Sequence, residues 1–133
     1  MRVGRLVSLV VGSLVVFAAC GSDDPGGAAA GPTRSVEIRT IDFAFRSDAA
    51  ITIIAGETVE FVVVNEGGVV HQMEVLTDES RRVGTTDRIE PGGSDTLTVT
   101  FDEPGVYQVI CDIDDHRSLG QQAEFRVANA PAG

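Results

Sequence analysis

The chain has 133 residues, with ten Arg, no Lys and twenty acidic residues, and its net charge is −10. This length allows one domain. The acidic balance excludes a nucleic-acid-binding role, because contact with phosphates needs a cationic surface, and it disfavours docking on anionic lipid. A basic protein partner is compatible with this charge, although acidity by itself mainly favours solubility.

Residues 1–19 have the pattern of a secretory signal peptide. Met1–Arg5 carries two positive charges, Leu6–Phe17 is almost continuously apolar, and small residues precede Cys20. The apolar run is shorter than the about 20 residues that span a bilayer. A cysteine after small residues resembles a bacterial lipobox, although Phe17 stands where Leu is usual. The resemblance implies a lipidated Cys20 on an extracytoplasmic, membrane-anchored protein, and the alternatives are a plain secreted protein and an uncleaved anchor.

Residues 20–34 are rich in Gly, Ala and Pro, which predicts a flexible tether. The tether leads to an expected domain over residues 35–128, and residues 129–133 form a short tail. If Cys20 carries lipid, Cys111 has no partner for an internal disulfide, and a lone thiol in an oxidising compartment is a liability unless something uses it. Metal ligation is one such use, and a buried, inert thiol is the alternative.

The domain is predicted to be all-β, because strand patterns recur between turns and no segment has a convincing helical period. The segment Thr77–Ser94 is polar and irregular, with Val83 and Ile89 as its expected anchors to the body. About seven or eight short strands predict an antiparallel Greek-key β-sandwich. The clearest expected strands are Val36–Phe45, Ile51–Ile54, Thr58–Val64, Val69–Leu76, Asp95–Phe101, Val106–Cys111 and Ala123–Val127.

The alternation of side chains along a strand predicts which residues face the core. His71 is in phase with the apolar Met73, so it is expected to point inward, and Glu74 is expected on the opposite face. Cys111 is in phase with Tyr107 and is also expected to point inward. Both residues lie near an end of their strand, so they become neighbours if those ends meet at one pole of the sandwich.

Four residues could then form one metal site. His71 and Cys111 come from the strands, and His116 and Gln121 come from the loop that follows Cys111. A soft thiolate, two imidazoles and a weak fourth donor suit a mononuclear copper site. Each histidine taken alone is more often a core or surface residue, and the combination favours copper. Structural zinc would need a closed four-ligand set, and no Ser–His–Asp arrangement points to an enzyme.

At these residues the sequence resembles the cupredoxins, the small blue-copper proteins. In that family a first histidine follows a turn with Asn and Gly, and a Gly-x-Tyr strand later ends in cysteine. A loop with a second histidine and an axial Met follows. The counterparts here are Asn65 before His71, Gly105–Tyr107 before Cys111, and then His116. The resemblance covers essentially the whole expected domain, and it implies a type 1 site with one copper ion.

Two departures from the family pattern concern the loop. Gln121 stands where the axial Met is usual. An axial amide oxygen would favour Cu(II) and lower the reduction potential. The alternative is that Gln121 is only a loop residue and that the copper site has three ligands. Asp114 and Asp115 replace Pro-Gly. Together with Asp112 they take the place of an apolar docking rim, either as an ordinary solvated loop or as a guide for a cationic partner or an incoming copper ion.

The favoured function is a membrane-tethered electron carrier that acts as a monomer and is not an enzyme. Its expected partner is a redox protein, or a copper donor or acceptor, with a basic docking surface. The alternatives are a copper-delivery lipoprotein in which redox cycling is incidental, and a metal-free sandwich that serves as an interaction module.

Overall fold

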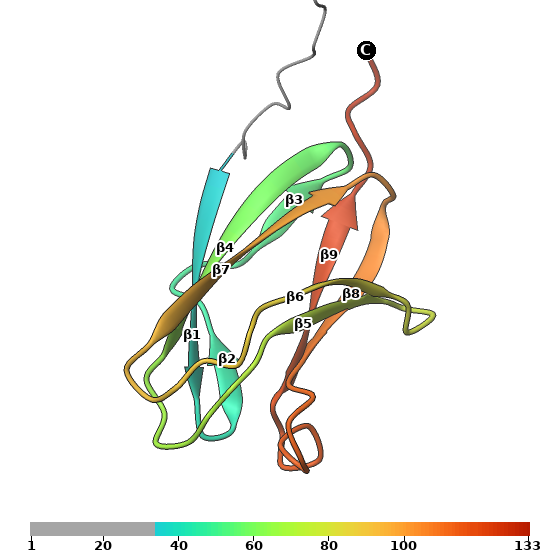
Figure 1. Ribbon diagram of the computed structural model, residues 1–133. Helices are drawn as coiled ribbons and strands as arrows, with labels where there is room; N and C mark the ends of the chain where they lie inside the picture. Colours follow the sequence, from blue (N-terminus) through green and yellow to red (C-terminus); the bar gives the residue numbers. More distant parts are fainter. Residues whose placement is uncertain (1–33) are drawn as a thin grey trace, which may run out of the picture.

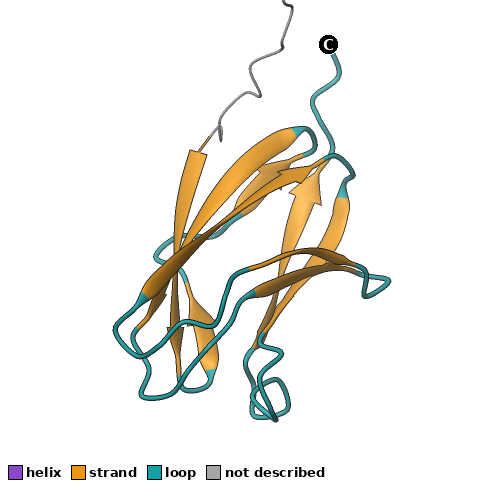
Figure 2. Ribbon diagram, in the orientation of Figure 1, coloured by secondary structure: helices purple, strands orange, loops and turns teal. Residues whose placement is uncertain are grey.

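The computed structural model describes residues 34–133, which form two β-sheets packed face to face (Figure 1 and Figure 2). One sheet has the strand order β2-β1-β4-β7, and the other has the order β3-β9-β8-β5-β6. Residues 34–133 contain no helix that is long and apolar enough to cross a membrane. The strands are β1 (Arg34–Ile41), β2 (Ala44–Arg46), β3 (Thr52–Ile54), β4 (Glu57–Asn65), β5 (Glu74–Thr77), β6 (Arg82–Thr85), β7 (Ser94–Phe101), β8 (Gly105–Ile110) and β9 (Gln122–Ala128).

The prediction of an all-β sandwich is confirmed, and the sheets are mixed rather than purely antiparallel. The β1–β4 and β3–β9 pairs are parallel, whereas the remaining strand pairs in these sheets are antiparallel. Parallel neighbours need a crossover connection, and here β2 and β3 lie between β1 and β4 in the chain. Alternation in the sequence shows which face of a strand is buried, but it does not identify the partner strand or its direction.

The core follows from the alternating apolar residues of β4 and β7. Phe61 lies opposite Leu97 in the register of these strands, and Val59 lies opposite Val99. All four are buried, with at most 9% of each residue exposed. Full burial of such a side chain stabilises the fold by about 1.5–3 kcal/mol.

An aromatic cluster fills the space between the two sheets. Phe101 makes edge contacts with Phe61, Tyr107 and Phe125 at ring-centroid distances of 6.2, 5.1 and 5.4 Å, and Tyr107 stacks on Phe125 at 5.7 Å. Such offset and edge-to-face pairs add stability beyond their buried area. The cluster therefore joins β4 and β7 of one sheet to β8 and β9 of the other.

The predicted strand Val69–Leu76 becomes regular only at Glu74. His71 lies before it and forms an isolated bridge with Ile89, in which each residue's N–H donates to the other's carbonyl at 3.1 and 2.8 Å. Glu74 was expected to face outward, but it is 5% exposed, and its carboxylate lies 2.9 Å from Arg82 Nη2. The ion pair with Arg82 on the neighbouring strand β6 explains how the carboxylate is accommodated.

The segment Thr77–Ser94, predicted to be irregular, contains the edge strand β6. Ile89 anchors it as expected, with 3% exposure, but the expectation for Val83 is wrong, because Val83 is 36% exposed. The next residue, Gly84, faces the body instead: a Cβ there would lie 2.9 Å from Leu97 Cδ1. Successive strand residues point to opposite faces, so the close approach at Gly84 turns Val83 outward.

Candidate metal centre

The connections that carry the predicted site residues lie at the end of the sandwich opposite the C-terminus (Figure 1). Three connections meet there: the β1–β2 turn, the segment that precedes β5, and the loop between β8 and β9. His71 belongs to the segment that precedes β5, and the loop between β8 and β9 contains Cys111, His116 and Gln121. The structure therefore brings together residues that are up to fifty positions apart in the sequence.

His71, Cys111 and His116 form one buried cluster. Their donor atoms all lie within 4.8 Å of one another, and the residues are 0%, 1% and 8% exposed. The Sγ atom of Cys111 lies 3.5 Å from Nδ1 of His116. Since metal bonds to nitrogen and sulfur are about 2.0–2.3 Å long, the spacing of these atoms is close to what a single ion can span.

The loop between β8 and β9 holds two of these side chains through its own backbone. The Cys111 N–H donates to the Gln121 carbonyl at 3.1 Å, and the Gln121 N–H donates to the His116 carbonyl at 3.0 Å. The His116 N–H donates to Ile113 at 3.0 Å, and Ile113 is only 5% exposed. The loop is thus closed by hydrogen bonds and anchored by one apolar side chain.

The Gln121 side chain is fully buried and only half satisfied. Its Nε2 donates to the hydroxyl of Thr40, which is also fully buried on β1, whereas its Oε1 has no hydrogen-bond partner. An unsatisfied buried acceptor costs about 1–3 kcal/mol. A metal ion would supply the missing partner, so the free oxygen fits the predicted axial role.

The imidazole of His71 is held by Asp42, a residue that the sequence analysis missed. His71 Nε2 lies 2.7 Å from Asp42 Oδ1, and His71 Nδ1 is buried without a partner. The Gly68 N–H donates to Asp42 Oδ2 at 2.8 Å; this bond first, and His71 next, hold the pKa of Asp42 below its ordinary value of 3.8. The sequence feature that could have pointed to Asp42 is its place as an acidic residue between Ile41 and Phe43 in an apolar stretch.

Asn65 fixes the backbone that leads to His71. It is fully buried at the end of β4. Its Nδ2 donates to the carbonyls of Val69 and Ile89, both at 2.8 Å, and its Oδ1 accepts the Gly67 N–H at 2.9 Å. The Asn-Gly turn noted in the sequence is therefore a side-chain-to-backbone clamp.

Phe43 packs against both histidines and was also missed. Its ring centroid lies 4.7 Å from that of His116 and 6.0 Å from that of His71. It comes from the β1–β2 turn, next to Asp42. An apolar ring beside the two imidazoles limits the access of water to them.

The surface around the site is both acidic and apolar. Asp112, Asp114 and Asp115 are exposed, as expected. Leu119 in the same loop is 52% exposed, and Val69 in the segment before His71 is 40% exposed. The acidic residues therefore accompany an apolar surface here and do not fully replace it.

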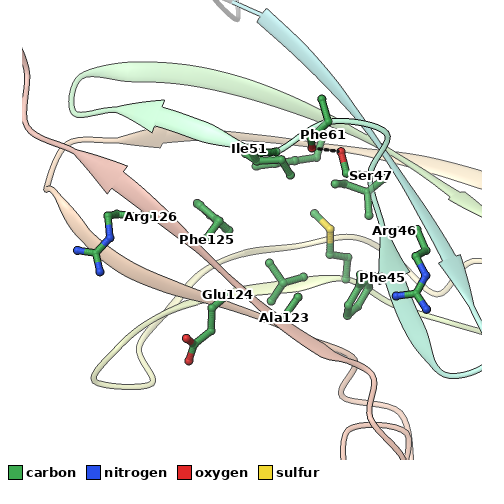
Figure 3. A pocket seen from close by; sticks show the side chains of 14 residues that line it. Phe45, Arg46, Ser47, Ile51, Phe61, Ala123, Glu124, Phe125 and Arg126 are labelled. Atoms are coloured by element: carbon green, nitrogen blue, oxygen red, sulfur yellow. Dashed lines mark hydrogen bonds between the residues drawn. The ribbon is translucent and has the colours of Figure 1, made fainter.

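A separate apolar cavity of about 450 Å³ opens between β2 and β9 (Figure 3). Its lining includes Phe45, Phe61 and Phe125, and the charged ends of Glu124 and Arg126 point away from these rings. None of the four predicted ligand residues lines it. The cavity is therefore distinct from the candidate metal centre.

The chemistry of the donor set fits a soft redox metal. The cluster joins a buried thiol to two buried imidazoles, one of which has an unpartnered Nδ1, and a buried amide oxygen in the same loop is also unpartnered. A His₂Cys set with a weak additional donor is the arrangement of blue-copper electron-transfer sites. The residues present fit a type 1 copper site on a β-sandwich.

The chain belongs to the cupredoxin-like domain family, whose family model matches residues 9–122. A comparison with the curated proteins gives no match. Among solved structures, the chain is similar to reduced auracyanin from the photosynthetic bacterium Roseiflexus castenholzii, with 20% identity and a TM-score of 0.61 over 76% of this chain and 100% of the other. It is also similar to auracyanin A, a "blue" copper protein from Chloroflexus aurantiacus, with 19% identity and a TM-score of 0.59 over 75% and 100% of the two chains.

A copper-containing nitrite reductase from Thermus scotoductus shares the fold over 74% of this chain but only 28% of its own, with 17% identity and a TM-score of 0.56. At these identities the similarities concern the fold. The family and the donor set together support a copper-binding electron carrier.

Proposed function

We propose that this chain is a one-electron carrier that holds a single copper ion through His71, Cys111 and His116. The observation that carries the proposal is the buried His–Cys–His cluster, in which Nδ1 of His71 is buried without a partner. When bound, copper supplies the one-electron exchange between Cu(II) and Cu(I). The residues of the chain supply a thiolate, two imidazoles and the hydrogen bonds that hold them in place.

Gln121 is the proposed axial ligand. Its unpartnered Oε1 and its backbone bonds to both Cys111 and His116 support this role. An amide oxygen is a harder donor than a thioether and favours Cu(II), so the reduction potential is expected to lie below that of a Met-ligated site.

His116 is the proposed exit for the electron. It is the most exposed of the three proposed equatorial ligands, at 8%, and its loop carries the exposed Leu119. The proposed partner is a redox protein with a basic surface and an apolar centre, which would match Leu119 and the neighbouring Asp114 and Asp115. Charge complementarity of this kind acts mainly on the association rate.

The proposed location is the extracytoplasmic side of a bacterial membrane. The support is the sequence of residues 1–34, in which a signal pattern ends at a candidate lipidation site, Cys20, and a tether follows. Residues 1–33 and Cys20 lie outside the described residues.

Copper delivery is the second candidate, and the exposed carboxylates of Asp112, Asp114 and Asp115 favour it, because they flank the ligand loop. The two functions differ in measurable rates. Fast electron self-exchange with slow copper release indicates a carrier, and ready transfer of copper to an acceptor indicates delivery.

The first experiment is the visible absorption and EPR spectrum of the purified protein after addition of Cu(II). An intense thiolate-to-copper band with narrow hyperfine splitting is expected. Cys111→Ser should abolish both features, and Cys20→Ser, the matched substitution at the other cysteine, should leave them intact. A pale, tetragonal spectrum that is the same in all three proteins would refute the proposal.

A further inference from the structure

The geometry points to Asp42 as a positioning residue of the metal centre. Its carboxylate accepts the Nε2–H of His71, selects the tautomer that leaves Nδ1 free for the metal, and lowers the reduction potential through its negative charge. The effect on the reduction potential rests on the proposed function. The choice of tautomer concerns the protein without metal and does not depend on that function.

The contact itself defines the tautomer. Asp42 Oδ1 lies 2.7 Å from His71 Nε2, and an ionised carboxylate can only accept a hydrogen bond. Nε2 therefore carries a proton, and Nδ1 is the ring nitrogen left for the metal. That Nδ1 is the buried atom without a partner.

The carboxylate is held on its other side as well. Gly68 N–H donates to Asp42 Oδ2 at 2.8 Å, so each oxygen of Asp42 has its own donor. The side chain of Asp42 remains 37% exposed while that of His71 is fully buried. The pair thus joins a solvated carboxylate to a buried imidazole that faces Cys111 and His116.

The neighbouring glycines leave space for this pair. A Cβ at Gly67 would lie 2.3 Å from Asp42 Oδ1 and 2.7 Å from His71 Nε2, whereas a Cβ at Gly68 would lie 3.3 Å from Asp42 Oδ2. Among the glycines of residues 34–133, Gly67 is therefore the one where an added methyl group would meet both partners and separate them without changing either of them. Gly68→Ala is the milder, matched substitution.

The charge of Asp42 acts on the metal through His71. A carboxylate hydrogen-bonded to a ligating imidazole raises the basicity of the ring, and loss of such a partner typically lowers metal affinity about 10–100-fold. A more basic ligand and a nearby negative charge both favour Cu(II) over Cu(I). Removal of the charge is therefore expected to raise the reduction potential.

The first test uses the metal-free protein and the ¹⁵N chemical shifts of the His71 ring. The wild type is expected to show a single tautomer with Nε2 protonated. Asp42→Asn should give a mixed tautomer, because an amide offers one acceptor where the carboxylate offers two. Gly67→Ala should also disturb the tautomer, and more strongly than Gly68→Ala.

The second test uses the copper-loaded protein, with Asp78→Asn as the control for charge, since Asp78 lies in the turn that joins β5 and β6. Asp42→Asn should lower copper affinity about 10–100-fold and raise the potential, and Asp78→Asn should do neither. A wild-type ring protonated on Nδ1 would overturn the inference even if no variant folds. A potential that shifts equally in both Asp variants would overturn the role of the charge.

The two proposals can fail separately. If the wild type gives no blue spectrum but its tautomer depends on Asp42, the copper assignment fails and the positioning of His71 stands. If the spectrum is blue and both the tautomer and the potential are unchanged in Asp42→Asn, the inference fails and the copper site stands.

Discussion

Replacement of Asn65 by Ala should destabilise the metal-free protein by about 2–3 kcal/mol. The substitution removes three hydrogen bonds of 2.8–2.9 Å. The Ile89 carbonyl keeps a second donor, the His71 N–H, so two groups lose the partner that Asn65 supplied: the Val69 carbonyl and the Gly67 N–H. Each lost partner costs about 1–3 kcal/mol, and the lower part of that range applies because both groups are partly reached by solvent.

Urea unfolding of the metal-free protein measures this loss without the added stability that a bound metal gives. With a denaturant slope of about 1–3 kcal/mol per M, a loss of about 2–3 kcal/mol should lower the midpoint by about 0.7–3 M. Asn129→Ala is the matched control, since Asn129 is exposed in the C-terminal tail. If the two variants differ by less than about 0.5 kcal/mol, a value typical of surface substitutions, the clamp is not what holds the segment before His71.

Three further substitutions test other parts of the structure. Gln121→Met should raise the reduction potential in voltammetry, because a thioether favours Cu(I); an unchanged potential would mean that Gln121 is not a ligand. Burial, the largest cause, raises the pKa of Tyr107 above its ordinary value of 10.0. The neutral Tyr107 therefore stabilises the folded state below pH 10, and this stabilisation is lost as the pH rises through the folded-state pKa. Wild-type stability should therefore fall more steeply above pH 10 than that of Tyr107→Phe, and parallel curves would contradict this. Arg82→Ala leaves the buried Glu74 carboxylate without its partner and should lower the free energy of unfolding by about 1–2 kcal/mol. An equal loss of stability in the neighbouring Arg81→Ala variant would show that the ion pair is not the cause.

The alternation of apolar residues was enough to predict that two of the proposed ligands face inward. His71 and Cys111 were assigned to inward faces from Met73 and Tyr107, and all four are buried. This works because one-sided burial of a strand leaves a period of two in the sequence. The predicted bounds were less accurate where a segment is held by single bridges, as at His71, because isolated bridges leave no periodic pattern.

The contacts around the ligands could not be predicted in the same way. Asp42 and Phe43 lie in the turn between β1 and β2, and they reach the histidines only because β1 pairs in parallel with β4 and carries that turn to the end of the sandwich. Local sequence patterns contain no information on such pairings, which join segments about 30 to 70 residues apart. A family resemblance supplies the ligand set, but it does not supply the partners that are particular to this chain.

The way the donors are held bears on the choice between electron transfer and copper delivery. His71 is tied to Asp42 by its ring and to Ile89 by its backbone, and Gln121 is tied to Thr40 by its side chain and to Cys111 by its carbonyl. Each of these two residues thus has one tie to β1 or to its turn, and the other tie joins His71 to the segment between β6 and β7 and Gln121 to the start of its own loop. A site built from such doubly fixed side chains changes little in shape when its charge changes, which keeps the barrier to electron exchange low. Delivery requires the ligands to leave the metal in turn, and each tie opposes that movement. The hydrogen bonds that hold His71 and Gln121, more than the types of the ligands themselves, therefore favour an electron carrier over a copper-delivery protein.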